Sequence, residues 1–205
     1  MGSNSHAERA RLAASIAELV DSAGLNVAVA ESLTGGMVAS ALAEATGSST
    51  WFRGAIVAYA REVKHQLLNV PPGPVVSAEA AAMMANGVRR LLRAEVAVAI
   101  TGAGGPSGQD GQPPGSVFFA LSDGVHIQVE SRCFDDDDPA EVCARTAAEA
   151  LRLLLNYLSR RQQTGPAPPE EPPPEGEGPL KRASSLHTST EESIGHERSG
   201  RRCSV

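Results

Sequence analysis

Serine, lysine and tyrosine side chains supply the chemistry of nucleophilic catalysis in this sequence. Ser32 follows a short apolar run and precedes two glycines, an arrangement that can expose a hydroxyl beside backbone amides at a helix start. Lys64 is the only lysine in residues 1–180, where arginine occurs repeatedly. Arginine stays protonated, whereas a desolvated lysine can lose its proton and act as a base. The sequence therefore suggests a Ser–Lys dyad, with Tyr59 relaying the proton or orienting the amine.

The same residues also have ordinary structural roles open to them. Ser32 or Thr34 would equally serve as the N-cap of a helix. Lys64 would solvate a helix face, and Tyr59 would be a strand aromatic. The five histidines fit a Ser-His-Asp triad poorly, because two lie in the C-terminal tail, one near the N-terminus, one at a solvent-facing helix position and one in a strand.

A Gly/Pro-rich segment starts at Thr101 and continues through Gly102, Ala103, Gly104, Gly105 and Pro106. Glycines let a backbone approach a ligand closely, but this spacing matches neither a Walker loop nor a GxGxxG fingerprint. This segment, the Ser32 segment and the segment from Tyr59 to Lys64 each follow a predicted buried strand. Ligands bind at the carboxyl ends of strands in open α/β sheets, so we expect the three segments to converge.

The elements that must position these residues follow from the hydrophobic pattern. Helices are predicted at 6–23, 34–45, 61–69, 77–93 and 138–158, and strands at 26–30, 54–59, 95–100, 116–121 and 125–133. The last two strands form a hairpin around Asp123-Gly124. The alternation of helix and strand predicts an α/β protein, a three-layer α/β/α sandwich with a mixed sheet in which the hairpin adds an antiparallel edge.

Composition divides the chain into one folded domain and a tail. Residues 1–160 have the apolar content of a single compact domain. Residues 161–205 contain a Pro/Glu-rich run that begins at Pro166, and then a Ser/Thr/Glu/Arg stretch to the end of the chain. Such a segment buries too little apolar surface to offset the entropy of ordering, so we predict that it is disordered.

Charge and residue usage exclude several classes of protein. The formal net charge is −6 and aromatic residues make up 3%, which argues against a nucleic-acid partner. No apolar run approaches the length of a membrane span, and the first residues do not resemble a signal peptide, so a cytoplasmic location is expected. Three cysteines without metal-ligand spacing predict reduced thiols and no metal site, with Cys133 and Cys143 as small core residues.

Several motifs together are specific enough to indicate a family. They are Ala30-Glu31-Ser32-Leu33-Thr34-Gly35-Gly36, Gly47-Ser48-Ser49, Phe52-Arg53-Gly54 through Tyr59, Lys64, Leu67-Leu68, Val70, Val76-Ser77 and Thr101-Gly102-Ala103-Gly104-Gly105-Pro106. In order and spacing this set resembles the CinA C-terminal domain family, over roughly residues 6–158. Characterised bacterial members are nicotinamide-mononucleotide (NMN) deamidases, which produce nicotinate mononucleotide and ammonia in pyridine-nucleotide salvage. The resemblance implies a small-molecule nucleotide substrate, no metal or organic cofactor, and a homo-oligomer, a dimer or higher.

The resemblance also implies roles for individual residues. Ser32 matches the family's nucleophile, Lys64 its base and Tyr59 its tyrosine. Backbone amides near Thr34, Gly35 and Gly36, or in the segment from Gly102 to Gly105, would then hold the oxyanion.

Further positions match the substrate-binding residues of the family. Thr101 matches the threonine at the start of the Gly/Pro-rich segment, and Arg145 matches an arginine of the last helix that would bind the substrate phosphate. Glu31 fits the family pattern as a residue that shapes the site. Ser48 is either a hydroxyl that lines the site or a helix or turn cap.

Three departures from the family pattern bear on activity. Leu33 replaces the usual cysteine after the serine, Ala103-Gly104 replaces a bulkier residue and alanine, and Asp136-Asp137-Asp138 replaces Gly-Asp-Arg. The added acids would weaken anion binding. An alternative function is therefore a catalytically silent paralogue that binds a nucleotide or a protein partner, and a third keeps the hydrolase chemistry with a different amide.

Overall fold

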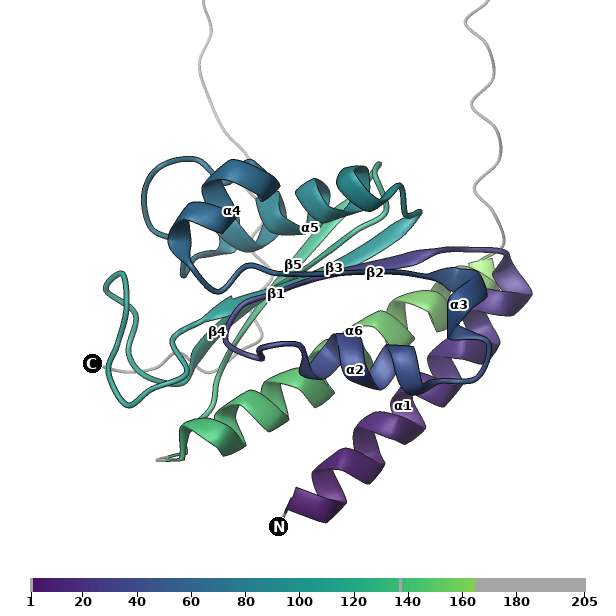
Figure 1. Cartoon of the computed structure of the whole chain (residues 1–205), viewed down its shortest axis with the longest axis horizontal. Coiled ribbons are helices and arrows are strands. Elements are labelled where there is room, and N and C mark those ends of the chain that lie inside the picture. The colour runs from purple at the N-terminus through teal and green to yellow at the C-terminus, as the bar shows by residue number, and fades with distance from the viewer. Residues whose placement is uncertain (1, 137, 165–205) are drawn as a thin grey trace, which may run out of the picture.

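The structure, a computed structural model, describes residues 2–136 and 138–164. It has the three-layer α/β/α arrangement that the sequence predicts (Figure 1). Helices α4 and α5 cover one face of a five-stranded sheet, and α1, α2 and α6 cover the other. The helices are α1 Gly2–Ala23, α2 Met37–Glu44, α3 Ser48–Trp51, α4 Arg61–Leu68, α5 Ala78–Leu92 and α6 Pro139–Thr164, and the strands are β1 Val27–Glu31, β2 Phe52–Val57, β3 Val96–Gly102, β4 Ser116–Ser122 and β5 Ile127–Cys133.

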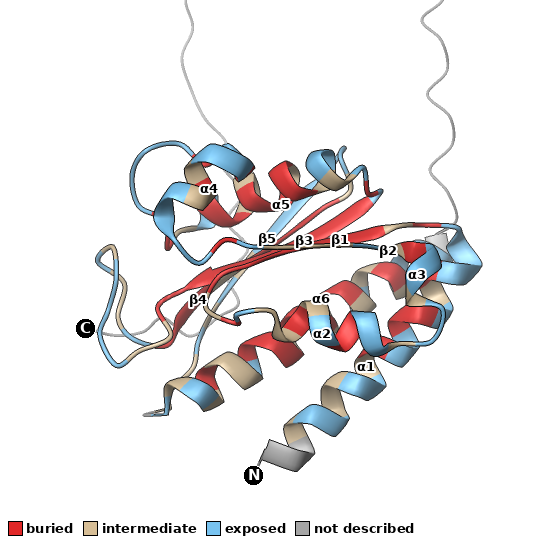
Figure 2. Ribbon diagram, viewed as in Figure 1, coloured by how far each residue is buried: buried red, intermediate tan, exposed pale blue. Residues whose placement is uncertain are grey.

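The sheet is mixed, with strand order β2-β1-β3-β4-β5. Strands β2, β1 and β3 run parallel to one another. Strand β4 is antiparallel to β3, and β5 is antiparallel to β4, as predicted for the hairpin. Every residue of β1 and β3 is buried, because helices cover both faces of the sheet at its centre (Figure 2). In register, Ala30 of β1 pairs with Ile56 and Ala99, so the three parallel strands end at the same edge of the sheet.

Residue size differs between the two sides of the central strands. Val27 and Val29 contribute to the core under α1, α2 and α6, whereas Ala28 and Ala30 contribute to the core under α5. The small side chains let α5 lie close to the sheet. Helix α5 also lies close to α4, because a Cβ at Gly87 of α5 would lie 2.5 Å from the carbonyl oxygen of Leu68 in α4.

The structure corrects three boundaries of the predicted elements. The predicted helix 34–45 begins only at Met37, because the chain turns through Gly35 and Gly36, whose φ angles are +59° and +104°. The predicted turn at 47–49 opens a short helix, α3. Helix α6 continues to Thr164, so the first residues of the predicted tail are helical. The rest of that tail, 165–205, lies outside the described residues.

The cysteine predictions are also corrected. Cys133 is exposed at the edge of the sheet. Cys143 is a free thiol but is only half-buried. Neither is therefore a core residue, and Cys203 lies outside the described part of the chain.

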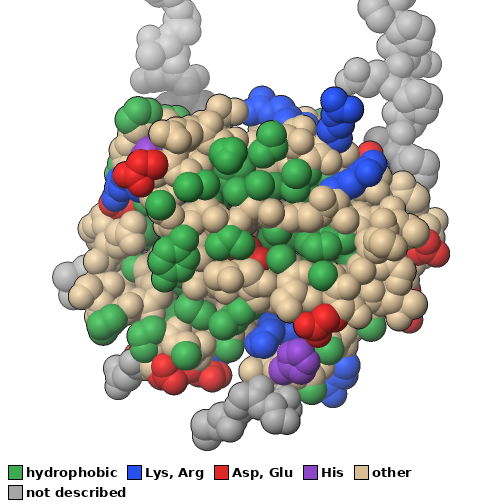
Figure 3. All heavy atoms as spheres, viewed as in Figure 1, with side chains coloured by type: hydrophobic (Ala, Val, Ile, Leu, Met, Phe, Trp, Pro, Cys, Tyr) green, Lys and Arg blue, Asp and Glu red, His purple; other side chains and the backbone are tan. Residues whose placement is uncertain are grey.

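The distribution of charged side chains on the surface bears on nucleic-acid binding. On the face seen in Figure 3, lysine and arginine side chains lie in small separate groups, with acidic side chains between them. That face offers no extended basic track for a nucleic-acid backbone.

Within residues 2–136 and 138–164, no helix is long and apolar enough to cross a membrane.

Candidate active site

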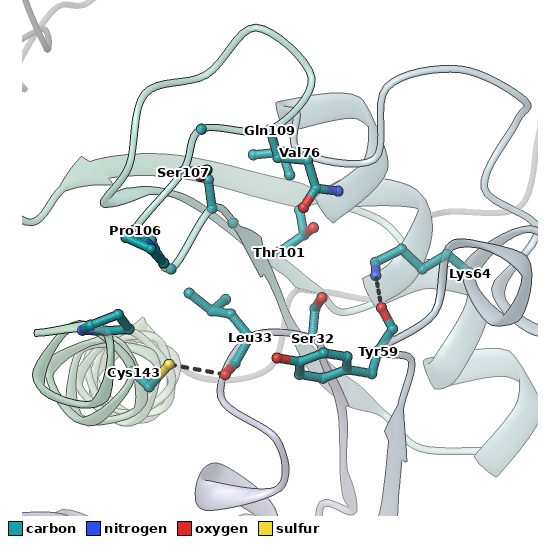
Figure 4. Close-up of a pocket in the computed structure, with 16 residues that line it drawn as sticks. Ser32, Leu33, Tyr59, Lys64, Val76, Thr101, Pro106, Ser107, Gln109 and Cys143 are labelled. Carbon is teal, nitrogen blue, oxygen red and sulfur yellow. Dashed lines mark hydrogen bonds between the residues drawn. The ribbon is translucent and has the colours of Figure 1, made fainter.

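A cavity of about 360 Å³ opens at the edge of the sheet where the parallel strands end. It brings together the three segments that the sequence singles out (Figure 4). Ser32 and Leu33 directly follow β1, Tyr59 and Lys64 follow β2, and the segment 101–109 comprises the last two residues of β3 and the loop after it. Pro139 and Cys143 of α6 complete the wall, together with Val76.

Lys64 is held inside this cavity by burial and by two hydrogen bonds. Only 2% of its surface is exposed, which excludes the alternative that it solvates a helix face. Its Nζ donates hydrogen bonds to the carbonyl oxygens of Ala58 at 2.6 Å and Tyr59 at 3.3 Å. Burial, and after it the positive charge of Arg61, lowers the pKa of Lys64 from 10.5 to about 8, against an opposing effect of Asp110. A neutral amine is therefore present in about a tenth of the molecules at pH 7.

Ser32 lies within the cavity and Tyr59 stands at its mouth. Ser32 is 8% exposed, and in Figure 4 its hydroxyl points toward the side of the cavity that holds Thr101 and Lys64. Tyr59 lies beyond the end of β2 and is 72% exposed, so it is not a packed strand aromatic. The geometry thus places a hydroxyl, an amine of lowered pKa and a phenol around one space.

Thr101 and Gly102 shape the third wall. The buried hydroxyl of Thr101 donates a 2.6 Å hydrogen bond to the carbonyl oxygen of Val75. Gly102 is required by a close approach to β4, because a Cβ there would lie 2.7 Å from the carbonyl oxygen of Ser116. Both residues line the cavity.

Glu31 does not line the cavity, but it fixes the turn that follows Ser32. Its fully buried carboxylate accepts hydrogen bonds from three amides at the start of α2, those of Gly36 at 3.0 Å, Val38 at 3.2 Å and Ala39 at 2.8 Å. Glu31 therefore caps α2, and the alternative that Ser32 or Thr34 is the cap is wrong. Thr34, Gly35 and Gly36 lie in the turn that Glu31 fixes and are not among the residues that line the cavity.

The Glu31→Gln substitution should lower the free energy of unfolding by about 1–3 kcal/mol, because one amide oxygen replaces two carboxylate oxygens that bond one buried and two half-buried amides. Thermal or denaturant unfolding would measure the change. Glu44→Gln is the matched control, since Glu44 is exposed at the other end of α2 and should change stability by less than about 0.5 kcal/mol. Equal stability of the two variants would contradict the role of Glu31 as a buried cap.

Two further predicted substrate-binding residues, Ser48 and Arg145, also lie outside the cavity. The hydroxyl of Ser48 donates to the carbonyl oxygen of Ala43 at 2.8 Å, which favours the cap over the site-lining role. Arg145 lies 3.7 Å from Asp136 and above the ring of Phe134, in a separate cavity between α1 and α6. Within residues 2–136 and 138–164, no arginine lines the candidate active site, and Lys64 is the only charged side chain among the lining residues.

Cys143 is a residue of the cavity that the sequence prediction missed. Its Sγ donates a 3.0 Å hydrogen bond to the carbonyl oxygen of Leu33, the residue after Ser32. Burial, with a smaller effect of Asp138, raises the pKa of the thiol, so it remains protonated and can serve as a donor. No sequence signal joins these residues, which are 110 positions apart.

Comparisons with known proteins identify the family of this chain. The family described as the CinA C-terminal domain matches residues 9–158. A CinA-like protein of Geobacter sulfurreducens is 39% identical over 148 residues, which cover 68% of this chain and 36% of that protein. A CinA-like protein of Geobacter sp. strain M21 is 38% identical over 155 residues, 73% of this chain and 37% of that protein. This chain thus spans about a third of the length of these curated relatives.

Solved structures match the same part of the chain. A CinA superfamily protein from Klebsiella pneumoniae has a TM-score of 0.71 and 28% identity, with 74% of this chain and 98% of that chain covered. A CinA superfamily protein from Escherichia coli has a TM-score of 0.70 and 32% identity, with 73% and 90% covered. The family match spans nearly all of the folded residues, including every residue that lines the cavity. This chain belongs to the CinA C-terminal domain family.

Proposed function

We propose that this protein is an amidohydrolase that converts NMN to nicotinate mononucleotide and ammonia through an acyl-enzyme. One observation carries the chemistry: a buried serine shares a cavity with a buried lysine whose pKa lies near 8. Such a lysine can be neutral at the pH at which it must accept a proton. The substrate is the one that the family resemblance implies. A homo-oligomeric state and a cytoplasmic location remain predictions from the sequence.

The proposed reaction has two stages that share one base. Neutral Lys64 takes the hydroxyl proton of Ser32, and the serine oxygen bonds to the carboxamide carbon. The tetrahedral adduct collapses as Lys64 returns that proton to the amide nitrogen, so ammonia leaves and an ester remains on Ser32. Water then attacks the ester while Lys64 takes a proton from it. The carboxylic acid leaves as the serine oxygen regains a proton, which restores the dyad.

Backbone amides of the Gly/Pro-rich loop are better placed than those before α2 to bind the oxyanion. The amide of Gly35 already bonds the carbonyl oxygen of Ser32 at 3.1 Å, and that of Gly36 bonds Glu31. Gly104 and Gly105 line the cavity, and no described residue accepts a hydrogen bond from their amides. A Cβ at Gly104 would lie 3.5 Å from Leu33, so this backbone passes close to the residue after the nucleophile. We therefore assign the oxyanion site to the amides of Gly104 and Gly105.

The lining of the cavity favours a second candidate, a hydrolase of an amide that lacks a phosphate. In the described part of the chain none of the lining residues is an arginine, and Arg145 is paired with Asp136 elsewhere. A substrate phosphate would therefore have to rely on loop amides and on Ser107. An amide without a phosphate would avoid this requirement while using the same Ser32 and Lys64.

An ammonia-release assay with NMN, nicotinamide riboside and nicotinamide tests the proposed function. We expect turnover of NMN, with nicotinate mononucleotide as the second product. Faster turnover of nicotinamide riboside would support the second candidate. Stabilisation by NMN in a thermal-shift experiment, without turnover of any of the three amides, would instead indicate a silent paralogue that binds a nucleotide and would overturn the proposed function.

A further inference from the structure

Asp110 sits at the tip of a small hairpin within the loop 103–115. The amide and carbonyl of Gln109 exchange hydrogen bonds with those of Gln112 at 3.0 and 2.9 Å. Asp110 and Gly111 between them have φ angles of +53° and +78°, which is the two-residue turn that Asp-Gly favours. Only 11% of the Asp110 side chain is exposed, so the turn directs its carboxylate inward.

The carboxylate of Asp110 bonds donors from two other segments. Its Oδ2 accepts from the amides of Val75 at 2.6 Å and Val76 at 3.0 Å, and its Oδ1 accepts from Arg61 at 2.6 Å. A second guanidinium nitrogen of Arg61 donates to the carbonyl oxygen of Gly73 at 2.7 Å. We call this set of five residues the Asp110 clasp.

Each segment that the Asp110 clasp joins carries part of the candidate active site. Arg61 begins α4, and Lys64 follows it by one helical turn. The carbonyl oxygen of Val75 accepts the hydroxyl of Thr101. The hairpin itself continues the loop that supplies Gly104 and Gly105 to the cavity.

We propose that Asp110 is a positioning residue that locks loop 103–115 against the start of α4 and so fixes the loop amides and the Lys64 amine around Ser32. The proposal rests on the proposed function for its catalytic consequence, but the placement of Lys64 can be tested without a substrate. Asp110 does not line the cavity, so it acts through Arg61 and the backbone rather than on the substrate.

The two charges of the Asp110 clasp affect Lys64 in opposite directions. Arg61 lowers the pKa of Lys64, whereas Asp110 raises it. Burial opposes ionisation of Asp110, but its bonds to Arg61 and to the two amides outweigh this effect and lower its pKa, so it is charged at neutral pH. Removing one charge or the other should therefore shift the pKa of Lys64 in opposite directions. The other titratable groups of α4 and of the segment before it are Tyr59, Glu62 and His65.

Lysine usage offers a direct probe, because Lys64 and Lys181 are the only lysines. Protein labelled with ¹³C at lysine Cε should show two titrating NMR signals, and Lys64→Met assigns them. We expect Asp110→Asn to lower the pKa of Lys64 and Arg61→Gln to raise it. We also expect Asp110→Asn to reduce kcat by about 10- to 100-fold, because small displacements of catalytic groups cost rates of this size.

Asp123→Asn is the matched control. Asp123 also precedes a glycine in a tight turn and accepts two amide hydrogen bonds, from Val125 and His126, but it lies in the β4–β5 hairpin. It should leave the Lys64 signal unchanged. The proposal is overturned if neither clasp variant moves that signal, or if Asp123→Asn moves it as far. If wild-type protein turns over no amide, the NMR titration still decides the placement of Lys64, so failure of the proposed function is distinguishable from failure of this inference.

Discussion

Lys64→Met should reduce kcat/KM at least about 10³-fold, since the variant has no group to take the proton of Ser32. In wild-type protein, kcat/KM should rise with pH through about 8, as Lys64 becomes neutral. The measurement is ammonia release from NMN across pH 6 to 10. Lys64→Arg should be equally inactive, because arginine stays protonated over that range. Lys181→Met, which removes the other lysine, is the control and should retain wild-type activity.

The unfolding free energy of Lys64→Met, measured against pH, tests whether Lys64 is the amine of lowered pKa on which the expected loss of activity depends. Because the pKa of Lys64 falls from 10.5 in the unfolded chain to about 8 in the folded protein, the two states bind protons equally below pH 8. Between pH 8 and 10.5 the unfolded chain binds more protons, so the free energy of unfolding of wild type rises with pH, by up to about 3 kcal/mol. Lys64→Met lacks this contribution, so its stability relative to wild type should be highest below pH 8. A relative stability that does not change between pH 8 and 10.5 would contradict the buried, easily deprotonated amine.

Ser32→Ala should lose on the order of 10⁶-fold in kcat, the size of effect seen when a covalent nucleophile is removed. Ser32 is buried and its replacement removes only an oxygen, so the variant should fold and bind NMN with little change. Single-turnover measurement with excess enzyme would separate binding from chemistry. Thr34→Ala is a suitable comparison, because Thr34 lies in the same turn but outside the cavity. Ammonia release by Ser32→Ala at a wild-type rate would rule out the acyl-enzyme.

The fold and the meeting of the three loops could be predicted from sequence for a definite physical reason. Helix and strand periods, interrupted by glycine and proline, identify the elements, and parallel strands that alternate with helices end at one edge of a sheet. Ser32 and Lys64 follow such strand ends and Thr101 lies at one, so their convergence needs no knowledge of side-chain contacts. Lys64 is the only lysine in residues 1–180, and a lysine, unlike an arginine, can lose its proton, so its role as a base could also be predicted.

The residues that sequence reasoning misplaced depend on contacts that no local pattern encodes. The capping of α2 by Glu31 requires the chain to turn at Gly35 and Gly36, and the sequence only indicated a helix start there. The role of Arg145 in substrate binding was implied by the family resemblance, but its side chain lies beside Asp136 and over the ring of Phe134. Asp110 reaches amides 34 and 35 positions away. The Asp110-Gly111 pair predicts a tight turn, but no local pattern predicts which residues the Asp110 carboxylate contacts.

Mass spectrometry of protein quenched with acid during turnover of NMN tests the Ser32 acyl-enzyme most directly. We predict a mass increase equal to the acyl group of the substrate, located on the peptide that contains Ser32. The adduct should be absent from Ser32→Ala, and Lys64→Met should form it far more slowly than wild type. An enzyme that releases ammonia from NMN while carrying no adduct, or carrying it on another residue, would contradict the Ser32 mechanism.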